Sequence, residues 1–149
     1  METINNIEDF SGSKYGNRIL ARTVAFQVLY QNDMNPDSDR ELTEDFLVSE
    51  LPEHEAIYKF ARSLIDGVLE KREEIDLKLR QVAKNWTVER MGSIDRNILR
   101  LAIFEIFYMD TQSNIVINEA IELAKKFSGK TSAAFVNGIL DAFWKKDKH

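Results

Sequence analysis

Hydrophobic side chains recur every three or four residues along most of the chain, the spacing of helices with one buried face. The pattern predicts helices over residues 17–31, near 42–47, over 52–68, near 75–82, over 93–107, over 117–127 and over 131–143. Only two Pro and six Gly interrupt 149 residues, which favours long helices. We therefore predict an all-α fold of about seven helices.

Local signals place several helix ends. Asn17 is a fair N-cap for the first helix, and Pro52 fits the first position of the third. Thr87 or Ser93 could cap the fifth, and Thr131 or Ser132 the seventh. The Ser128-Gly129 pair is expected to end the sixth.

The fifth predicted helix is apolar around most of its circumference, so we expect it to be central. Glu105 lies on its apolar side. A buried carboxylate needs a partner, and no second carboxylate is placed to act with it, so we expect a hydrogen-bonded structural role.

The two ends of the chain differ from the helical middle. Residues 1–16 hold two Ser and two Gly and are predicted to be a flexible arm, followed by a single domain over residues 17–149. No signal-peptide pattern occurs at the start. The most apolar stretch, from Leu101 to Met109, is far shorter than the ~18 residues of a membrane helix. We expect a soluble cytoplasmic protein that does not bind membranes.

The composition of the chain excludes several kinds of catalytic and metal site. The chain has no Cys, which excludes disulfides, thiolate nucleophiles, iron–sulfur clusters and cysteine-based zinc sites. Its two His are His54, in a charged segment beside Pro52, and His149, the last residue. No glycine-rich phosphate loop, His-Glu-x-x-His motif or nucleophile elbow is present. We predict no catalytic residue, no metal site and no cofactor.

Charge is unevenly distributed. The net charge is −5, which alone argues against nucleic-acid binding. Residues 14–30 carry +3 and residues 125–149 carry +4, whereas residues 33–53 carry −7. If the first and last helices lie close in space, they share one electropositive surface.

A few residues are candidates for a binding site. Arg18 and Arg22 are four apart and share a helix face, which suits a phosphate backbone but also an ordinary solvated face. Phe135 lies at the edge of the last helix's inward stripe, shortly after Lys130, Thr131 and Ser132. An aromatic ring beside a helix N-terminus can stack a base while free N–H groups hold a phosphate; boundary packing is the alternative.

Asp95 lies at the start of the fifth predicted helix, where an acid satisfies the helix dipole. A charged contact with a partner is the functional alternative.

Four motifs, in their order and spacing, resemble the NusB family of bacterial transcription antitermination factors. They are RTVAFQVLYQ (residues 22–31), DRNILRLAIFE (95–105), INEAIELAK (117–125) and FVNGILD (135–141). The resemblance runs from about residue 17 to residue 143. It implies two packed three-helix bundles that share a long central helix, without enzymatic activity.

The resemblance also implies partners. Members of the family pair with NusE, a protein of the small ribosomal subunit. Together the two bind the boxA element of nascent ribosomal RNA leaders and help RNA polymerase pass terminators. Some members assist ribosome maturation.

Individual residues match positions with these roles. The family's basic N-terminal segment corresponds to Lys14, Arg18 and Arg22, although Ile19, Leu20 and Ala21 separate the two Arg. Its RNA-facing loop and aromatic correspond to Lys130, Thr131, Ser132 and Phe135, and its NusE-facing positions to Tyr30 and Asp95. The thin Arg segment predicts weak, less salt-sensitive RNA binding by this chain alone.

Three alternatives stay open. A NusB-like domain also begins certain ribosomal RNA methyltransferases, but the sequence ends at His149, which favours a standalone factor. A protein-only adaptor would bind NusE without RNA. An enzyme would need paired carboxylates, such as Glu89 and Asp95, in a cleft.

Overall fold

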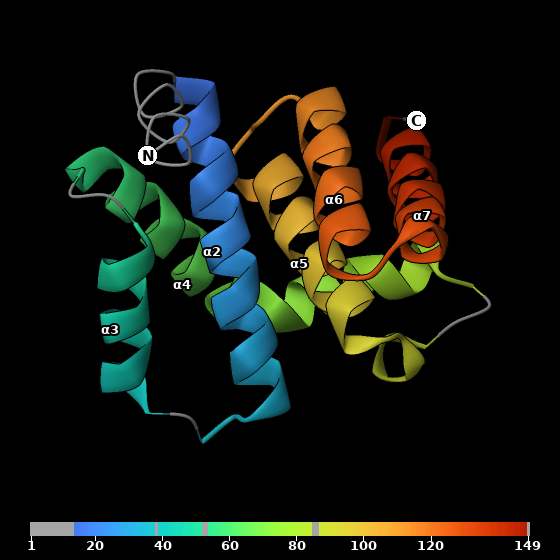
Figure 1. The fold of residues 1–149 in the computed structure, drawn as a ribbon. Helices are drawn as coiled ribbons and strands as arrows, with labels where there is room; N and C mark the ends of the chain where they lie inside the picture. The colour runs from blue at the N-terminus through green and yellow to red at the C-terminus, as the bar shows by residue number, and fades with distance from the viewer. Residues whose placement is uncertain (1–13, 38, 52–53, 85–86, 149) are drawn as a thin grey trace. The chain divides into compact units, whose positions relative to one another are not determined.

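A computed structural model describes residues 14–37, 39–51, 54–84 and 87–148, with side chains described between residues 17 and 145 of these ranges. The described residues form six α-helices, one short 3-10 turn and no strand, so the predicted all-α class is confirmed (Figure 1). The elements are α2 (Lys14–Met34), α3 (Arg40–Glu50), α4 (Glu55–Val82), η1 (Val88–Arg90), α5 (Ser93–Tyr108), α6 (Ser113–Phe127) and α7 (Lys130–Lys148).

The chain divides into two compact units. The first ends at Ile65 and contains α2, α3 and the beginning of α4. The second begins at Asp66 and contains the rest of α4 together with α5, α6 and α7, which pack on one another. The long helix α4 therefore belongs to both units, as the resemblance implied for a shared helix.

The first helix begins earlier than its predicted N-cap. α2 starts at Lys14, so Asn17 lies inside the helix and the last three residues of the predicted arm are helical. Residues 1–13 of that arm lie outside the described residues, as does Pro52. In α3, a side-chain oxygen of Asp39 accepts a hydrogen bond from the backbone N–H of Glu41 at 2.9 Å, which satisfies the helix start.

The helices predicted over 52–68 and 75–82 are one helix, so this part of the prediction is wrong. The apolar spacing is interrupted only where Lys71 and Arg72 occupy the inward position, and both side chains are half-buried. Long basic side chains cover apolar surface with their methylene stems. The helix therefore continues where the run of apolar residues is interrupted.

The prediction that α5 is central is confirmed. Every residue from Asn97 to Glu105 is buried. Glu105, at 1% exposed, is among them, as expected from its place on the apolar side. The buried apolar residues of the second unit include Val68, Ile75, Leu79, Ile98, Leu99, Ile103, Val116, Ala120, Val136 and Leu140.

Two contacts fix α5 against the second half of α4. Arg100 donates from Nε and Nη2 to the two carboxylate oxygens of Asp76, at 2.8 and 2.9 Å, and both residues are buried. Further along α5, the Phe104 ring lies directly over Gly67, in the space that a Cβ atom would take. The C-terminal end of the same helix carries Tyr108, which stacks on Phe104 with centroids 5.4 Å apart.

Candidate nucleic-acid interface

The basic residues of α2 gather on one aromatic ring of α4. The guanidinium carbon of Arg18 lies 4.3 Å from the centroid of Phe60, and that of Arg22 lies 5.5 Å from it. Both Arg therefore share one helix face, as their spacing predicted. Arg18 is exposed, whereas Arg22 is only 4% exposed. As the side chains stand, Arg18 alone presents its charge to solvent.

The other two predicted site residues of the first unit, Lys14 and Tyr30, lie at the start and near the end of α2. Lys14 is the first residue of α2, and its side chain lies outside the described part of the structure. Tyr30 lies one turn before the end of α2 and is half-buried. Its ring centroid is 6.2 Å from that of Phe26, at a tilt of 40°. Part of the Tyr30 ring is thus available to a partner.

The connection between α6 and α7 is a tight turn. The backbone N–H groups of Ser128 and Gly129 both donate to the carbonyl of Ala124 at 2.9 Å, and Gly129 has a φ of 141°. A positive φ is easily adopted only by glycine, so this turn ends α6 as predicted. α7 begins at Lys130, so Thr131 and Ser132 lie in its first turn and neither is the cap.

Ser132 holds α7 to the start of α5. Its hydroxyl donates to Oδ1 of Asp95 in the first turn of α5, and Ser132 is only 7% exposed. The structure thus brings together two residues that the resemblance assigned to different partners. Lys130 and Thr131 stay exposed beside this bond, and Phe135 is half-buried one turn later.

The predicted caps of α5 are also corrected. Gly92 occupies the N-cap position of α5, and Thr87 precedes the turn η1 instead. The side chain of Arg96 ties the two together, because its Nη1 donates to the carbonyls of Val88 and Met91 at 3.3 Å. The start of α5 is therefore held by a side chain of its own first turn.

Each carboxylate of the enzyme alternative accepts a hydrogen bond from another side chain. Glu89 is exposed and accepts a hydrogen bond from Arg80 Nη2 at 3.1 Å, whereas Asp95 accepts from Ser132. A backbone hydrogen bond and the Arg80 side chain lower the pKa of Glu89. A general acid needs the opposite shift, so Glu89 is suited to an ion pair.

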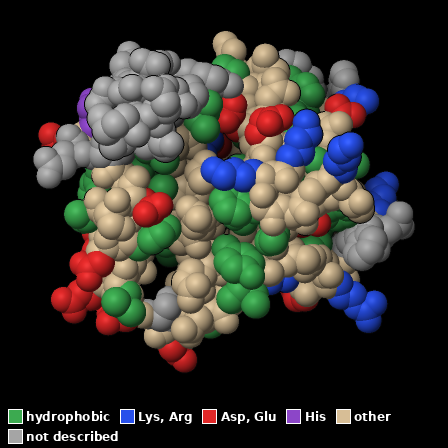
Figure 2. Space-filling view, viewed as in Figure 1, with side chains coloured by type: hydrophobic (Ala, Val, Ile, Leu, Met, Phe, Trp, Pro, Cys, Tyr) green, Lys and Arg blue, Asp and Glu red, His purple; other side chains and the backbone are tan. Residues whose placement is uncertain are grey.

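Charge is segregated over individual elements of the surface. In Figure 2, acidic side chains gather over α3 and basic ones over α6 and α7. The Arg pair of α2 and the lysines of α7 belong to different units, so the shared electropositive surface stays a prediction. Among the described helices, none combines the length and hydropathy that a membrane-spanning segment requires.

Ser132→Ala is expected to lower the free energy of unfolding by about 1–2 kcal/mol, because it removes a partly buried hydrogen bond to a carboxylate. Thr131→Ala is the matched control, since it deletes a neighbouring hydroxyl that is exposed. Urea denaturation followed by circular dichroism measures both. Equal losses in the two variants would show that the Asp95–Ser132 bond contributes nothing.

Sequence reasoning missed one residue and one contact of this region. Phe60 is not among the candidate residues of the sequence, and only the structure shows that its ring lies against both Arg of α2. The bond between Asp95 and Ser132 joins residues 37 positions apart. No local pattern signals such a contact, because it depends on how α5 and α7 pack.

Known proteins resemble this chain over most of its length. A sequence model described as the NusB family matches residues 20–145. The transcription antitermination protein NusB of Oceanobacillus iheyensis is 46% identical over 125 residues, covering 83% of this chain and 95% of its own. The NusB of Geobacter sulfurreducens is 45% identical over 127 residues, covering 85% and 92%.

Solved structures agree with the sequence matches. A crystal structure of the antitermination factors NusB and NusE in complex with double-stranded RNA is similar with a TM-score of 0.79 and 30% identity, over 87% of this chain and 97% of that one. NusB of T. maritima is similar with a TM-score of 0.76 and 33% identity, over 87% and 91%. The chain therefore belongs to the NusB family.

Proposed function

We propose that this chain is a transcription antitermination factor that binds single-stranded boxA RNA of ribosomal RNA leaders together with NusE, and so helps RNA polymerase pass terminators. It acts by binding and is not an enzyme. The observation that supports binding to NusE and RNA is the likeness to a NusB structure that contains NusE and double-stranded RNA. The single-stranded form of the RNA is proposed from the surfaces described next.

Local geometry supports two RNA-binding surfaces, one in each unit. In the first unit, the exposed guanidinium of Arg18 lies over the ring of Phe60. The buried guanidinium of Arg22 lies near the same ring, and Lys14 precedes both Arg on α2. In the second unit, Lys130 and Thr131 lie exposed at the start of α7, where backbone N–H groups favour phosphate. Phe135 offers part of its ring to a base.

Single-stranded RNA fits these surfaces better than a duplex does. Side chains cannot read the deep, narrow major groove of A-form RNA, whereas unpaired bases stack on aromatic rings. The described surfaces offer few cations and two partly exposed aromatic rings, Phe60 and Phe135, which suits a short contact with unpaired nucleotides. Ser132, engaged with Asp95, contributes by fixing the start of α7.

NusE is proposed to contact Tyr30 in the first unit and Asp95 in the second. Because Asp95 also accepts the Ser132 hydroxyl, a partner that contacts Asp95 is coupled to the RNA-facing turn of α7 by one hydrogen bond. Linkage then requires RNA and NusE to strengthen or weaken each other's binding by the same factor.

The proposal is tested by fluorescence anisotropy with labelled RNA and the pre-formed complex of this chain with NusE. We expect tighter binding to a single-stranded boxA sequence than to a scrambled strand or to the boxA duplex. The burial of Arg22 favours one other candidate, a protein-only NusE adaptor. Formation of the NusE complex without any preference for boxA would establish that candidate instead.

Arg18→Gln is expected to weaken RNA binding and to reduce the salt dependence, with the slope of log K against log salt falling in magnitude by about 0.7 for one lost contact with single-stranded phosphate. Arg40→Gln is the matched control, because Arg40 is an exposed Arg on the acidic helix α3 of the same unit. Anisotropy titrations at several salt concentrations measure both slopes. Equal slopes in the two variants would contradict a phosphate contact at Arg18.

A further inference from the structure

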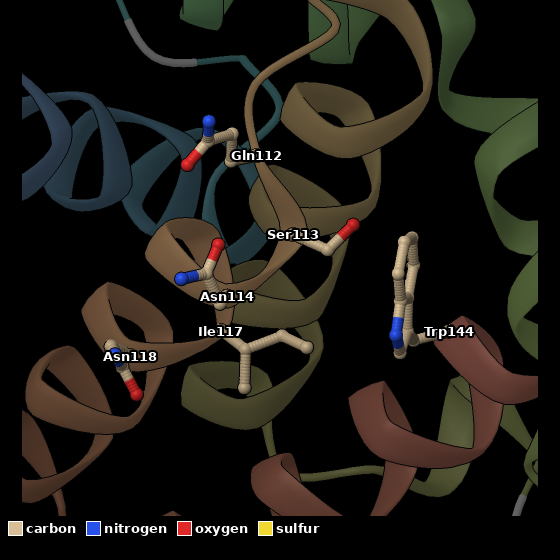
Figure 3. Close-up of a pocket in the computed structure, with 6 residues that line it drawn as sticks. All are labelled: Gln112, Ser113, Asn114, Ile117, Asn118 and Trp144. Atoms are coloured by element: carbon tan, nitrogen blue, oxygen red, sulfur yellow. The ribbon is translucent and has the colours of Figure 1, made fainter.

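A pocket of about 530 Å3 lies between the start of α6 and the second half of α7, within the second unit. It is lined by Gln112, Ser113, Asn114, Ile117, Asn118 and Trp144. Figure 3 shows the indole of Trp144 projecting from α7 toward Ser113 and Ile117, with the three amide side chains beyond them in this view. None of these residues belongs to the surfaces proposed above.

The lining has an unusual combination of properties. None of the six residues carries a formal charge. Three of them have side-chain amides that both donate and accept hydrogen bonds, and one has a large flat ring. The lining therefore has no charged side chain that could balance the charge of a phosphate or a metal ion. A flat, neutral group with donors and acceptors at its edge matches the lining.

Ser113 shows that the pocket has unused hydrogen-bonding capacity. It is 9% exposed, and its hydroxyl makes no hydrogen bond within the described residues. In Figure 3 the hydroxyl points toward the side of Trp144. The N-cap residue Gln112 makes no side-chain bond to the first turn of α6, so backbone N–H groups also face this end of the helix. The hydroxyl can donate to or accept from the edge of a ligand bound at this point.

Nucleobases have the matching chemistry. Asn and Gln amides pair with base edges, and tryptophan stacks on base faces with little regard to sequence. Pockets of about 300–1,000 Å3 hold small organic ligands, so a nucleoside fits this volume.

We propose that this pocket binds one unpaired nucleobase of a single-stranded RNA, stacked on Trp144 and hydrogen-bonded by the amides and hydroxyl of α6. This inference rests on the proposed function, because it assigns the RNA an additional contact. Trp144 lies nine residues after Phe135 on α7, about 13 Å along the helix axis. The pocket would therefore bind a different nucleotide from the one at Phe135.

Trp144→Leu tests the stacking contact. It keeps an apolar side chain but removes the ring, so RNA affinity of the complex with NusE is expected to fall about 5- to 150-fold. The salt slope should not change, because no phosphate contact is lost. Trp144→Phe should retain most of the affinity. Phe107→Leu is the matched control, since it removes an exposed aromatic ring of the same unit outside the pocket.

A second readout follows the pocket directly. The indole N–H resonance of Trp144, identified by its absence in Trp144→Phe, is expected to shift when single-stranded RNA is added to the 15N-labelled protein. A parallel titration with adenosine monophosphate tests whether the pocket binds a free nucleotide. If it binds at this resonance as tightly as the RNA does, the pocket takes a free nucleotide and the RNA assignment is wrong.

The outcomes separate this inference from the proposed function. If the wild-type complex binds boxA RNA and Trp144→Leu binds it equally well, the pocket assignment is overturned and the proposed function stands. An equal loss in Trp144→Phe and Trp144→Leu would also overturn it, because stacking would not be the cause. If the wild-type complex binds no RNA, both proposals fail.

Discussion

Asp76→Ala is expected to lower the free energy of unfolding by about 3–5 kcal/mol, because it leaves the buried Arg100 guanidinium without its carboxylate. Arg100 is 4% exposed and both of its hydrogen bonds to Asp76 are shorter than 3 Å. A buried charge that loses a paired carboxylate is less well compensated for its removal from water. The loss therefore exceeds what the ion pair itself contributes to stability.

An exposed ion pair of the same unit provides the comparison. Arg80 and Glu89 meet at 3.1 Å, but their side chains are 48% and 70% exposed. Glu89→Ala is expected to change the free energy of unfolding far less than Asp76→Ala does, since water replaces the lost contact. Urea denaturation followed by circular dichroism measures both variants. A loss at Asp76 no larger than that at Glu89 would contradict a buried, compact pair between α4 and α5.

Gly67→Ala is expected to destabilise the protein by about 1–3 kcal/mol, although alanine favours helices more than glycine does. A Cβ atom at Gly67 would lie 2.0 Å from Cζ of Phe104 and within 2.6 Å of two further ring atoms. Phe104 is 8% exposed and is stacked on Tyr108, so its ring has little room to move aside. The substitution therefore forces α4 and α5 apart.

Gly138→Ala is the matched control for this variant. Gly138 also lies inside a helix, but a Cβ atom there would meet nothing within 4 Å. Alanine at this position should raise the free energy of unfolding by about 0.5–1 kcal/mol through the loss of backbone freedom in the unfolded chain. If both substitutions stabilise the protein in thermal and urea denaturation, the Phe104 ring does not confine Gly67.

The hydrophobic pattern predicted the helices better than it predicted their ends. The apolar circumference of residues 94–107 correctly indicated a buried helix, because a helix without a polar face has to be surrounded. The same reasoning split α4 in two, because it treated Lys71 and Arg72 as polar surface. Caps were also misplaced. Gly92 lacks the side chain by which an N-cap is usually recognised, and Arg96 instead donates to carbonyls of the turn before the helix.

The candidate site was predictable where it depends on spacing along one helix. Arg18 and Arg22 share a face because they are four residues apart, and the structure confirms it. The burial of Arg22 depends on tertiary packing, including Phe60 of α4, which no pattern within α2 reveals. The pocket at Trp144 was missed for the same reason, since its lining comes from α6, its N-cap residue Gln112 and α7.

RNA and NusE are proposed to bind this chain cooperatively, which a comparison of RNA affinities can test. The affinity of this chain for a labelled single-stranded boxA RNA is determined by fluorescence anisotropy with and without saturating NusE, at one fixed salt concentration. A second subunit extends the RNA surface, so we predict weak binding by the chain alone and markedly tighter binding by the pair. Equal RNA affinity with and without NusE would contradict cooperative binding.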